Sequence, residues 1–129
     1  MVLCVMSYDP EKAPSPEEWL ELGEDEKVSW IVEYHEGSGQ EEPEGDWELH
    51  SILHCVVENQ IALGTGNVPE TIKKLIRQGL CRHDAVHAVG SVVGEDIHAL
   101  LDSQAMFDPK KYRRRLDKLT AKRWLKGKW

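Results

Sequence analysis

The sequence has few cysteines and no long apolar run. Its three cysteines, Cys4, Cys55 and Cys81, are odd in number and form no C-x-x-C pair, so neither a disulfide framework nor a cysteine zinc site is indicated. No apolar run approaches the roughly 18 residues of a membrane-spanning helix, and the start of the chain does not have the form of a secretory signal. These absences predict a cytoplasmic protein without a membrane span.

Each end of the chain is nearly devoid of one sign of charge. Residues 1–48 carry fifteen Asp or Glu against Lys12 and Lys27, whereas residues 110–129 carry ten Lys or Arg against Asp117. A basic segment is one way to bind nucleic acid, but the net charge of −7 disfavours that role. We expect the basic end to dock on the acidic half of its own chain; docking on a second subunit, as in a homodimer, or on an anionic partner are the further alternatives.

The pattern of apolar residues indicates helices throughout. No stretch alternates with a period of two for long enough to predict a strand, and apolar residues recur at helical spacing instead. The 129 residues, 40% of them apolar, suit a single domain over residues 1–129. The sequence therefore predicts an all-α fold, a compact bundle of about four main helices plus a short N-terminal helix.

Capping residues and helix breakers mark where these helices begin and end. Ser15, with Glu18 three residues later, resembles a capping box, Gly79 suits a helix end, and Asp108 precedes the last helix. We expect a core over about residues 16–103, with the basic helix as an extension. The predicted helices are a short one that begins at Pro16 and longer ones over about 25–36, 47–63, 68–78, 81–103 and 109–125.

Histidines on two of the predicted helices repeat a spacing of four residues. In LHSILHCVVENQ, His50, His54 and Glu58 lie within about 80° of one another on a helical wheel, at the border of an apolar sector. His83 and His87 have the same spacing on the long helix. Two such helices facing each other would supply four imidazole nitrogens, with Glu58 as a fifth ligand, a hydrogen-bond partner of a ligand, or a general base.

These residues predict a site for one divalent metal ion. Zinc suits four nitrogen ligands best, and iron, nickel or manganese would follow if Glu58 binds directly. The predicted function is metal binding or metal-dependent hydrolysis of an unknown substrate. The alternative is a non-enzymatic protein-interaction module in which the same histidines make structural hydrogen bonds. The predicted metal ligands are His50, His54, Glu58, His83 and His87.

The remaining histidines and two glycines need a separate interpretation. We interpret His35 and His98 as structural residues. Gly90 and Gly94 lie on the histidine face of the long helix, where each glycine costs about 1 kcal/mol relative to alanine. We therefore expect another backbone or a ligand to approach this face closely, and the helix that carries His50 is the simplest partner.

Three other motifs carry less information. HDAVHAVGSVV has the H-x-x-x-H-x-x-G spacing of a zinc protease, but Asp84 replaces the usual glutamate and Val93 stands where a third histidine would be. No strand precedes GTGN at residues 64–67, so a turn between helices explains it better than a phosphate loop. For Cys55 or Cys81 as a nucleophile paired with histidine there is only proximity in sequence, and buried, unreactive thiols are expected.

The stretches EEWLEL, DEKVSWIVEYH, LHSILHCVVENQIA and GLCRHDAVHAVGSVV together resemble an uncharacterised bacterial family, a domain of unknown function made of small helical proteins. That family pairs H-x-x-x-H-x-x-x-E-[EN]-Q with a second helix bearing H-[DE]-x-x-H. The resemblance covers about residues 16–103 and implies an all-α fold without implying an activity. The matching residues are His50, His54, Glu58, Asn59, Gln60, His83, Asp84 and His87.

A more distant likeness links the chain to hemerythrin-type bundles, in which H-x-x-x-E and H-x-x-x-H helices hold two irons. His54 with Glu58 and the pair His83 and His87 match those motifs, and the likeness would make His35 a further ligand. The basic segment after Asp108 has no histidine, which departs from the bundle's ligand set.

Overall fold

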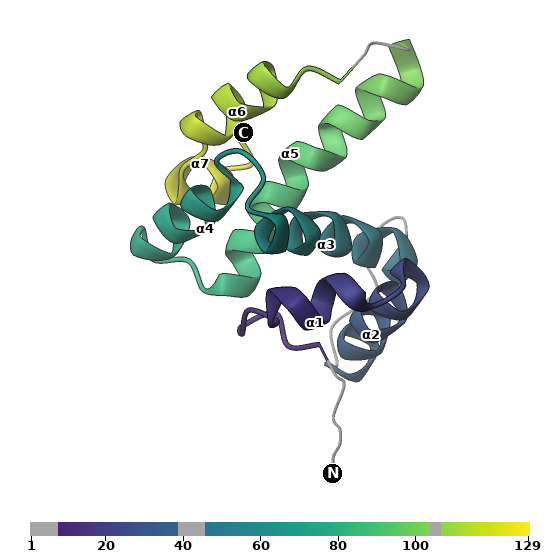
Figure 1. Ribbon diagram of the computed structural model, residues 1–129. Helices are drawn as coiled ribbons and strands as arrows, with labels where there is room; N and C mark the ends of the chain where they lie inside the picture. Colours follow the sequence, from purple (N-terminus) through teal and green to yellow (C-terminus); the bar gives the residue numbers. More distant parts are fainter. Residues whose placement is uncertain (1–7, 39–45, 104–106) are drawn as a thin grey trace.

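The computed structural model describes residues 8–38, 46–103 and 107–129, and all regular secondary structure within these ranges is helical (Figure 1). This confirms the predicted all-α class. The described residues form seven helices, so the expected bundle of about four main helices and a short one is met only roughly. The helices are α1 (Pro16–Glu21), α2 (Glu24–Gly37), α3 (Asp46–Leu63), α4 (Val68–Arg77), α5 (Arg82–Ser103), α6 (Pro109–Lys118) and α7 (Ala121–Leu125).

The helix ends follow the predicted signals in part. Asp108 caps α6 by accepting hydrogen bonds from the backbone N–H groups of Lys110 and Lys111, at 3.0 and 3.4 Å. Gly79 follows α4 with a φ of 108°, a left-handed conformation that favours glycine. The capping box at α1 does not form, because the Ser15 hydroxyl donates to the Glu17 carboxylate instead.

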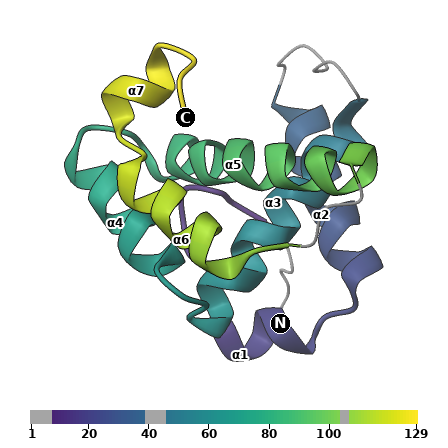
Figure 2. The same cartoon turned by 90° about the horizontal axis from the view of Figure 1, so that it is seen from above.

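Helix α3 lies at the centre of the molecule and packs against α1, α2, α4 and α5. Seen from above, α5 crosses over α3, with α4 and α6 on one side of α5 and α7 on the other (Figure 2). Buried apolar residues form two clusters, one on each side of α3. The larger cluster joins α3 to α4, α5, α6 and α7, and the smaller one, Tyr8, Trp19, Ile31 and Cys55, joins α3 to α1, α2 and the segment before α1.

The basic C-terminal segment is divided and belongs to the larger cluster. The single helix expected over about 109–125 breaks at Leu119, which is extended, and Thr120, whose hydroxyl accepts from the Arg123 N–H at 3.1 Å and caps α7. Tyr112 and Leu116 are buried in the larger cluster together with Leu119. This segment therefore contributes to the hydrophobic core.

The contacts of this segment differ from the docking that its charge predicted. Arg115 pairs with Glu95 and Asp96 of α5, and the Lys74 ammonium of α4 donates to the carbonyl of Leu116 at 3.1 Å. These partners lie in α4 and α5, not in the acidic residues 1–48, because the apolar face of α6 turns toward the larger cluster. None of the helices that the structure describes is both long and apolar enough to cross a membrane.

We predict that Leu116→Ala lowers the free energy of unfolding by about 2–5 kcal/mol, because the side chain is fully buried and its removal leaves a cavity. Leu125→Ala, at a side chain that is 68% exposed, should change it by less than about 0.5 kcal/mol. Denaturant unfolding followed by circular dichroism measures both. Equal stability of the two variants would show that the C-terminal segment adds nothing to the core.

Candidate metal centre

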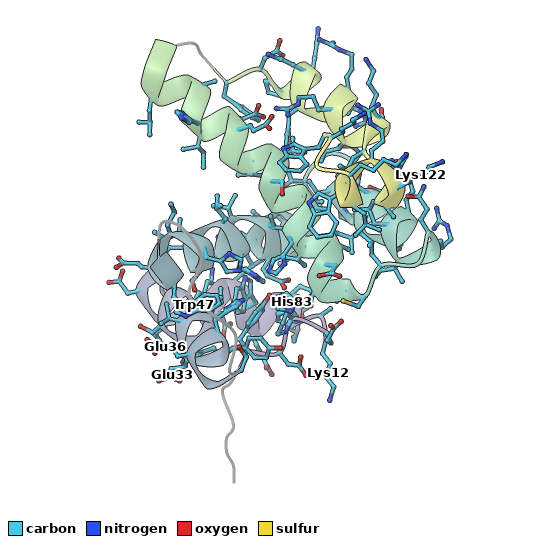
Figure 3. The ribbon with its side chains drawn as sticks, turned by 180° about the vertical axis from the view of Figure 1, so that it is seen from behind. Lys12, Glu33, Glu36, Trp47, His83 and Lys122 are labelled. Atoms are coloured by element: carbon cyan, nitrogen blue, oxygen red, sulfur yellow. The ribbon has the colours of Figure 1, made fainter. Side chains whose placement is uncertain are left out.

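Five histidines from three helices meet at the crossing of α3 and α5. Each offers one ring nitrogen, and these five nitrogens all lie within 4.8 Å of one another. We call this group the five-histidine cluster. Figure 3 labels His83 of α5 and Trp47 of α3, whose ring centroid lies 5.4 Å from that of His50. The members are His35 of α2, His50 and His54 of α3, and His83 and His87 of α5.

Helix periodicity and packing explain how the five rings come together. On α3 and on α5, a spacing of four residues places two histidines on the same helix face, one turn apart. Packing of α3 against α5 turns the two pairs toward each other, and packing of α2 against α3 brings in His35. His35, His54 and His83 are buried, whereas His50 and His87 are partly exposed. The cluster is thus closed on one side and reaches solvent on the other.

The nitrogens of three rings are close enough to share one ion. The His87 Nε2 lies 2.9 Å from the His54 Nε2 and 3.0 Å from the His50 Nε2. Nitrogens bound to one zinc ion at about 2.0–2.1 Å are about 3–3.5 Å apart, so small movements of these rings would admit a metal. The ring centroids of His83 and His87 are 4.2 Å apart, which brings the remaining ring of α5 into the same group.

The second nitrogen of two rings is held by the protein in the way that metal-binding histidines require. His35 donates its Nδ1–H to the Ile31 carbonyl at 2.8 Å, which leaves the Nε2 lone pair free of a proton. The His54 Nδ1 lies 3.1 Å from the Tyr8 hydroxyl. The Nε2 atoms of His35 and His83 are buried and have no hydrogen-bond partner. A buried nitrogen without a partner requires an explanation, and an ion or an ordered water would each supply one.

Burial keeps the five imidazoles neutral at neutral pH. Desolvation, with a smaller contribution from the neighbouring imidazoles, lowers the pKa of His50 to about 4 and that of His87 to about 3. The same causes hold the pKa of His54 well below its ordinary value, and burial lowers the pKa values of His35 and His83. Neutral imidazole is the form that binds a metal.

Glu58, the fifth predicted ligand, lies beside the five-histidine cluster and is not one of its members. Its buried carboxylate accepts two hydrogen bonds from Arg82, each 2.8 Å long, and a third from the Tyr8 hydroxyl at 2.6 Å. A buried carboxylate requires such a counter-charge. Because Tyr8 donates to Glu58, its oxygen accepts from the His54 Nδ1–H, and Glu58 orients His54 through Tyr8.

The sequence interpretation took His35 as structural, with only the hemerythrin likeness making it a ligand, and it missed Tyr8 and Arg82. One feature of the sequence could have placed His35 in the site. It lies four residues after Ile31, on the apolar face of the same helix, and a ring on that face points into the core. Nothing marked Tyr8, which reaches the site from the segment before α1. His98 is exposed near the far end of α5 and lies outside the cluster.

Neither of the two cysteines that the structure describes belongs to the five-histidine cluster. Cys55 is buried, and burial together with the carboxylate of Glu24 raises its pKa to about 12, so the thiol stays protonated. Cys81 is exposed, contrary to the expected burial, because it precedes the first turn of α5 at the surface. Cys4 lies outside the described residues.

No family model, curated protein or solved structure matches the chain. The resemblance to the uncharacterised bacterial family and the likeness to hemerythrin-type bundles therefore stay predictions. The case for a function rests on the geometry of the five-histidine cluster and on the residues around it.

We predict that Arg82→Met destabilises the protein by about 3–5 kcal/mol, because it leaves the Glu58 carboxylate buried without a counter-charge. Adding Glu58→Gln should recover most of this loss, since the remaining amide is uncharged and still accepts from Tyr8. Arg113→Met, at an exposed arginine, serves as the control. Urea unfolding measures all three, and a loss below about 1 kcal/mol in Arg82→Met would contradict the need for this ion pair.

Acid should destabilise the metal-free protein over the range set by the lowered histidine pKa values. Between the ordinary value of 6.5 and the value of about 4 for His50, the unfolded chain binds protons that the folded cluster does not. The free energy of unfolding should therefore have its full value above about pH 6.5 and decrease as the pH is lowered below that value. Urea unfolding midpoints measured at about pH 7 and pH 5 test this. The decrease in midpoint should be smaller in His87→Gln, which lacks one of the histidines with a lowered pKa. A higher urea midpoint at pH 5 than at pH 7 would be the opposite of the expected effect and would refute the explanation by the lowered histidine pKa values.

Proposed function

We propose that the protein binds one divalent transition-metal ion in the five-histidine cluster. The observation that carries the proposal is the convergence of five ring nitrogens within 4.8 Å of one another. The lowered pKa values keep these rings neutral, and the Nε2 atoms of His35 and His83 are buried without a partner. An ion at the centre would satisfy those nitrogens.

Zinc is the metal that we propose first. A set of imidazoles without a carboxylate suits zinc, whereas manganese favours oxygen ligands. Glu58, which would have shifted the preference toward iron, nickel or manganese, has its oxygens engaged by Arg82 and Tyr8. Iron and nickel follow zinc because imidazole also binds them well, and manganese comes last.

Metal-dependent hydrolysis is the reaction class that we propose for this site. A zinc ion held by protein nitrogens with one position open lowers the pKa of a bound water to about 7, which supplies hydroxide at neutral pH. His50 and His87 lie on the partly exposed side of the cluster, where such a position would face solvent. His35 and His54, both buried and oriented by hydrogen bonds to Ile31 and Tyr8, would hold the ion from the closed side.

A second candidate function is a protein-interaction module in which the histidines are structural. The spacings of 3.0 and 2.9 Å from the His87 Nε2 to His50 and His54 are also the lengths of N–H···N hydrogen bonds. Such bonds would join α3 to α5 without an ion. In this alternative the buried Nε2 atoms of His35 and His83 stay unsatisfied, and we therefore place it second.

Elemental analysis of the untagged, purified protein tests the proposal. We expect about one equivalent of metal per chain in the wild type and in His98→Ala, whose histidine is outside the cluster. The double variant His54→Ala, His87→Ala should contain none. Alanine at a buried site lowers stability, so the test is repeated with the double variant His54→Gln, His87→Gln, because glutamine is closer in size to histidine. Circular dichroism checks that this variant keeps its helical content.

Two results would contradict a metal function. One is a wild-type protein that stays empty after incubation with Zn²⁺ and removal of the excess. The other is a glutamine double variant that retains as much metal as the wild type. An empty wild type whose histidine variants unfold more easily would instead support the interaction module.

A further inference from the structure

Two glycines in the middle of α5, Gly90 and Gly94, are not explained by helix packing. Each costs about 1 kcal/mol relative to alanine at such a position. A Cβ built on Gly90 would lie 3.9 Å from the Val57 Cγ2, and one on Gly94 would lie 3.6 Å from the Leu53 Cδ1. These are ordinary contact distances, and neither glycine has a positive φ. The fold therefore accepts alanine at both positions, and another cause must favour glycine.

Both glycines line a cavity of about 310 Å³ that adjoins the five-histidine cluster. Its inner end is formed by buried residues such as His54, Val86 and Gly90, and its outer end by the partly exposed Ser91 and Gly94. The cavity thus leads from solvent to the histidines. We call it the glycine-walled cavity; its lining residues are His50, Leu53, His54, Val86, His87, Gly90, Ser91 and Gly94.

Apart from the histidines, the wall of this cavity offers a ligand almost no polar group. The Ser91 hydroxyl donates to the His87 carbonyl at 3.0 Å and accepts from the Trp124 indole N–H at 3.1 Å, so its one proton is already donated and is not offered to an anion. Leu53, Val86 and the two glycines are apolar. A ligand that fits would have a hydrocarbon part and one polar group at the histidine end.

The charge of the proposed metal site favours an anion at that end. Five neutral imidazoles leave both positive charges of a divalent ion uncompensated, and Glu58 is already neutralised by Arg82. The carboxylates of Glu11, Asp84 and Asp9 also act on His83. The Asp84 side chain is 46% exposed, and Glu11 and Asp9 are exposed, so water screens all three charges. An exogenous anion would balance the charge within the cavity.

We infer that the glycine-walled cavity binds a small organic anion of the short-chain carboxylate class, with its carboxylate on the metal ion and its hydrocarbon chain against Leu53, Val86 and the two glycines. This inference rests on the proposed metal function. A volume of 310 Å³ is at the lower end of the range for ligand pockets, which limits the chain to a few carbon atoms. Gly90 and Gly94 keep the space for that chain open.

The test uses the full chain loaded with Co²⁺, whose visible absorption changes when a ligand binds to the metal. Acetate and butyrate are titrated as probes, with butyramide as the uncharged control. Butyrate should bind about fifteenfold more tightly than acetate, since it has two more CH₂ groups and each one that is buried contributes about fourfold. Butyramide should produce no comparable change.

The double variant Gly90→Ala, Gly94→Ala should bind Co²⁺ as the wild type does and resist denaturant better. We expect it to lose the preference for butyrate over acetate, because two methyl groups occupy the space of the hydrocarbon chain. Gly37→Ala, at a helical glycine with open space around its Cβ position, is the matched control and should bind both probes as the wild type does. Val86→Ala should instead enlarge the cavity and raise the affinity for hexanoate.

Each outcome distinguishes the two proposals. If Co²⁺ binds but butyrate gains nothing over acetate, or the alanine double variant keeps the wild-type preference, the ligand inference is wrong and the metal function stands. If the double variant is less stable than the wild type, packing requires the glycines and the inference loses its basis. If Co²⁺ does not bind at all, the proposed metal function is wrong, and the inference of a metal-bound anion is wrong as well.

Discussion

The burial of five neutral imidazoles at one crossing is the constraint on which the arrangement of α2, α3 and α5 depends. Each ring must give up water, and desolvation together with the neighbouring rings keeps it uncharged. A shift of α3 by one residue would rotate His50 and His54 by about 100° out of the crossing. The register in which α3 packs therefore decides whether the rings converge. The same register buries the apolar residues of α3 and brings its two histidines to the crossing.

A layer of hydrogen bonds around the cluster orients one of its rings. His54 contacts the Tyr8 hydroxyl, Tyr8 donates to Glu58, and Glu58 is held by Arg82. The Arg82 guanidinium also donates to the Pro10 carbonyl at 2.8 Å, which ties the segment before α1 to the start of α5. A conventional carboxylate and arginine pair thus sets the tautomer of a buried histidine, and it joins parts of the chain that are far apart in sequence.

The two sides of the cluster suit different tasks. The closed side contains His35 and His54, whose orientation is set by Ile31 and Tyr8, and rigid donors of this kind favour retention of an ion. The open side contains His87, whose side chain is 24% exposed and lies at the wall of the glycine-walled cavity. Such an asymmetry is what a site needs if it is to hold an ion and still exchange a ligand.

The sequence by itself determined the helical class, most helix positions and four members of the cluster, because apolar periodicity and the spacing of four residues are local properties of a helix. It did not determine that His35 joins them, since that depends on how α2 packs on α3. Nor did it determine that Glu58 pairs with Arg82, or that the segment after Asp108 divides and enters the core. These were decided only by the tertiary structure, because a buried charge or an apolar face finds its partner through contacts between residues far apart in the chain.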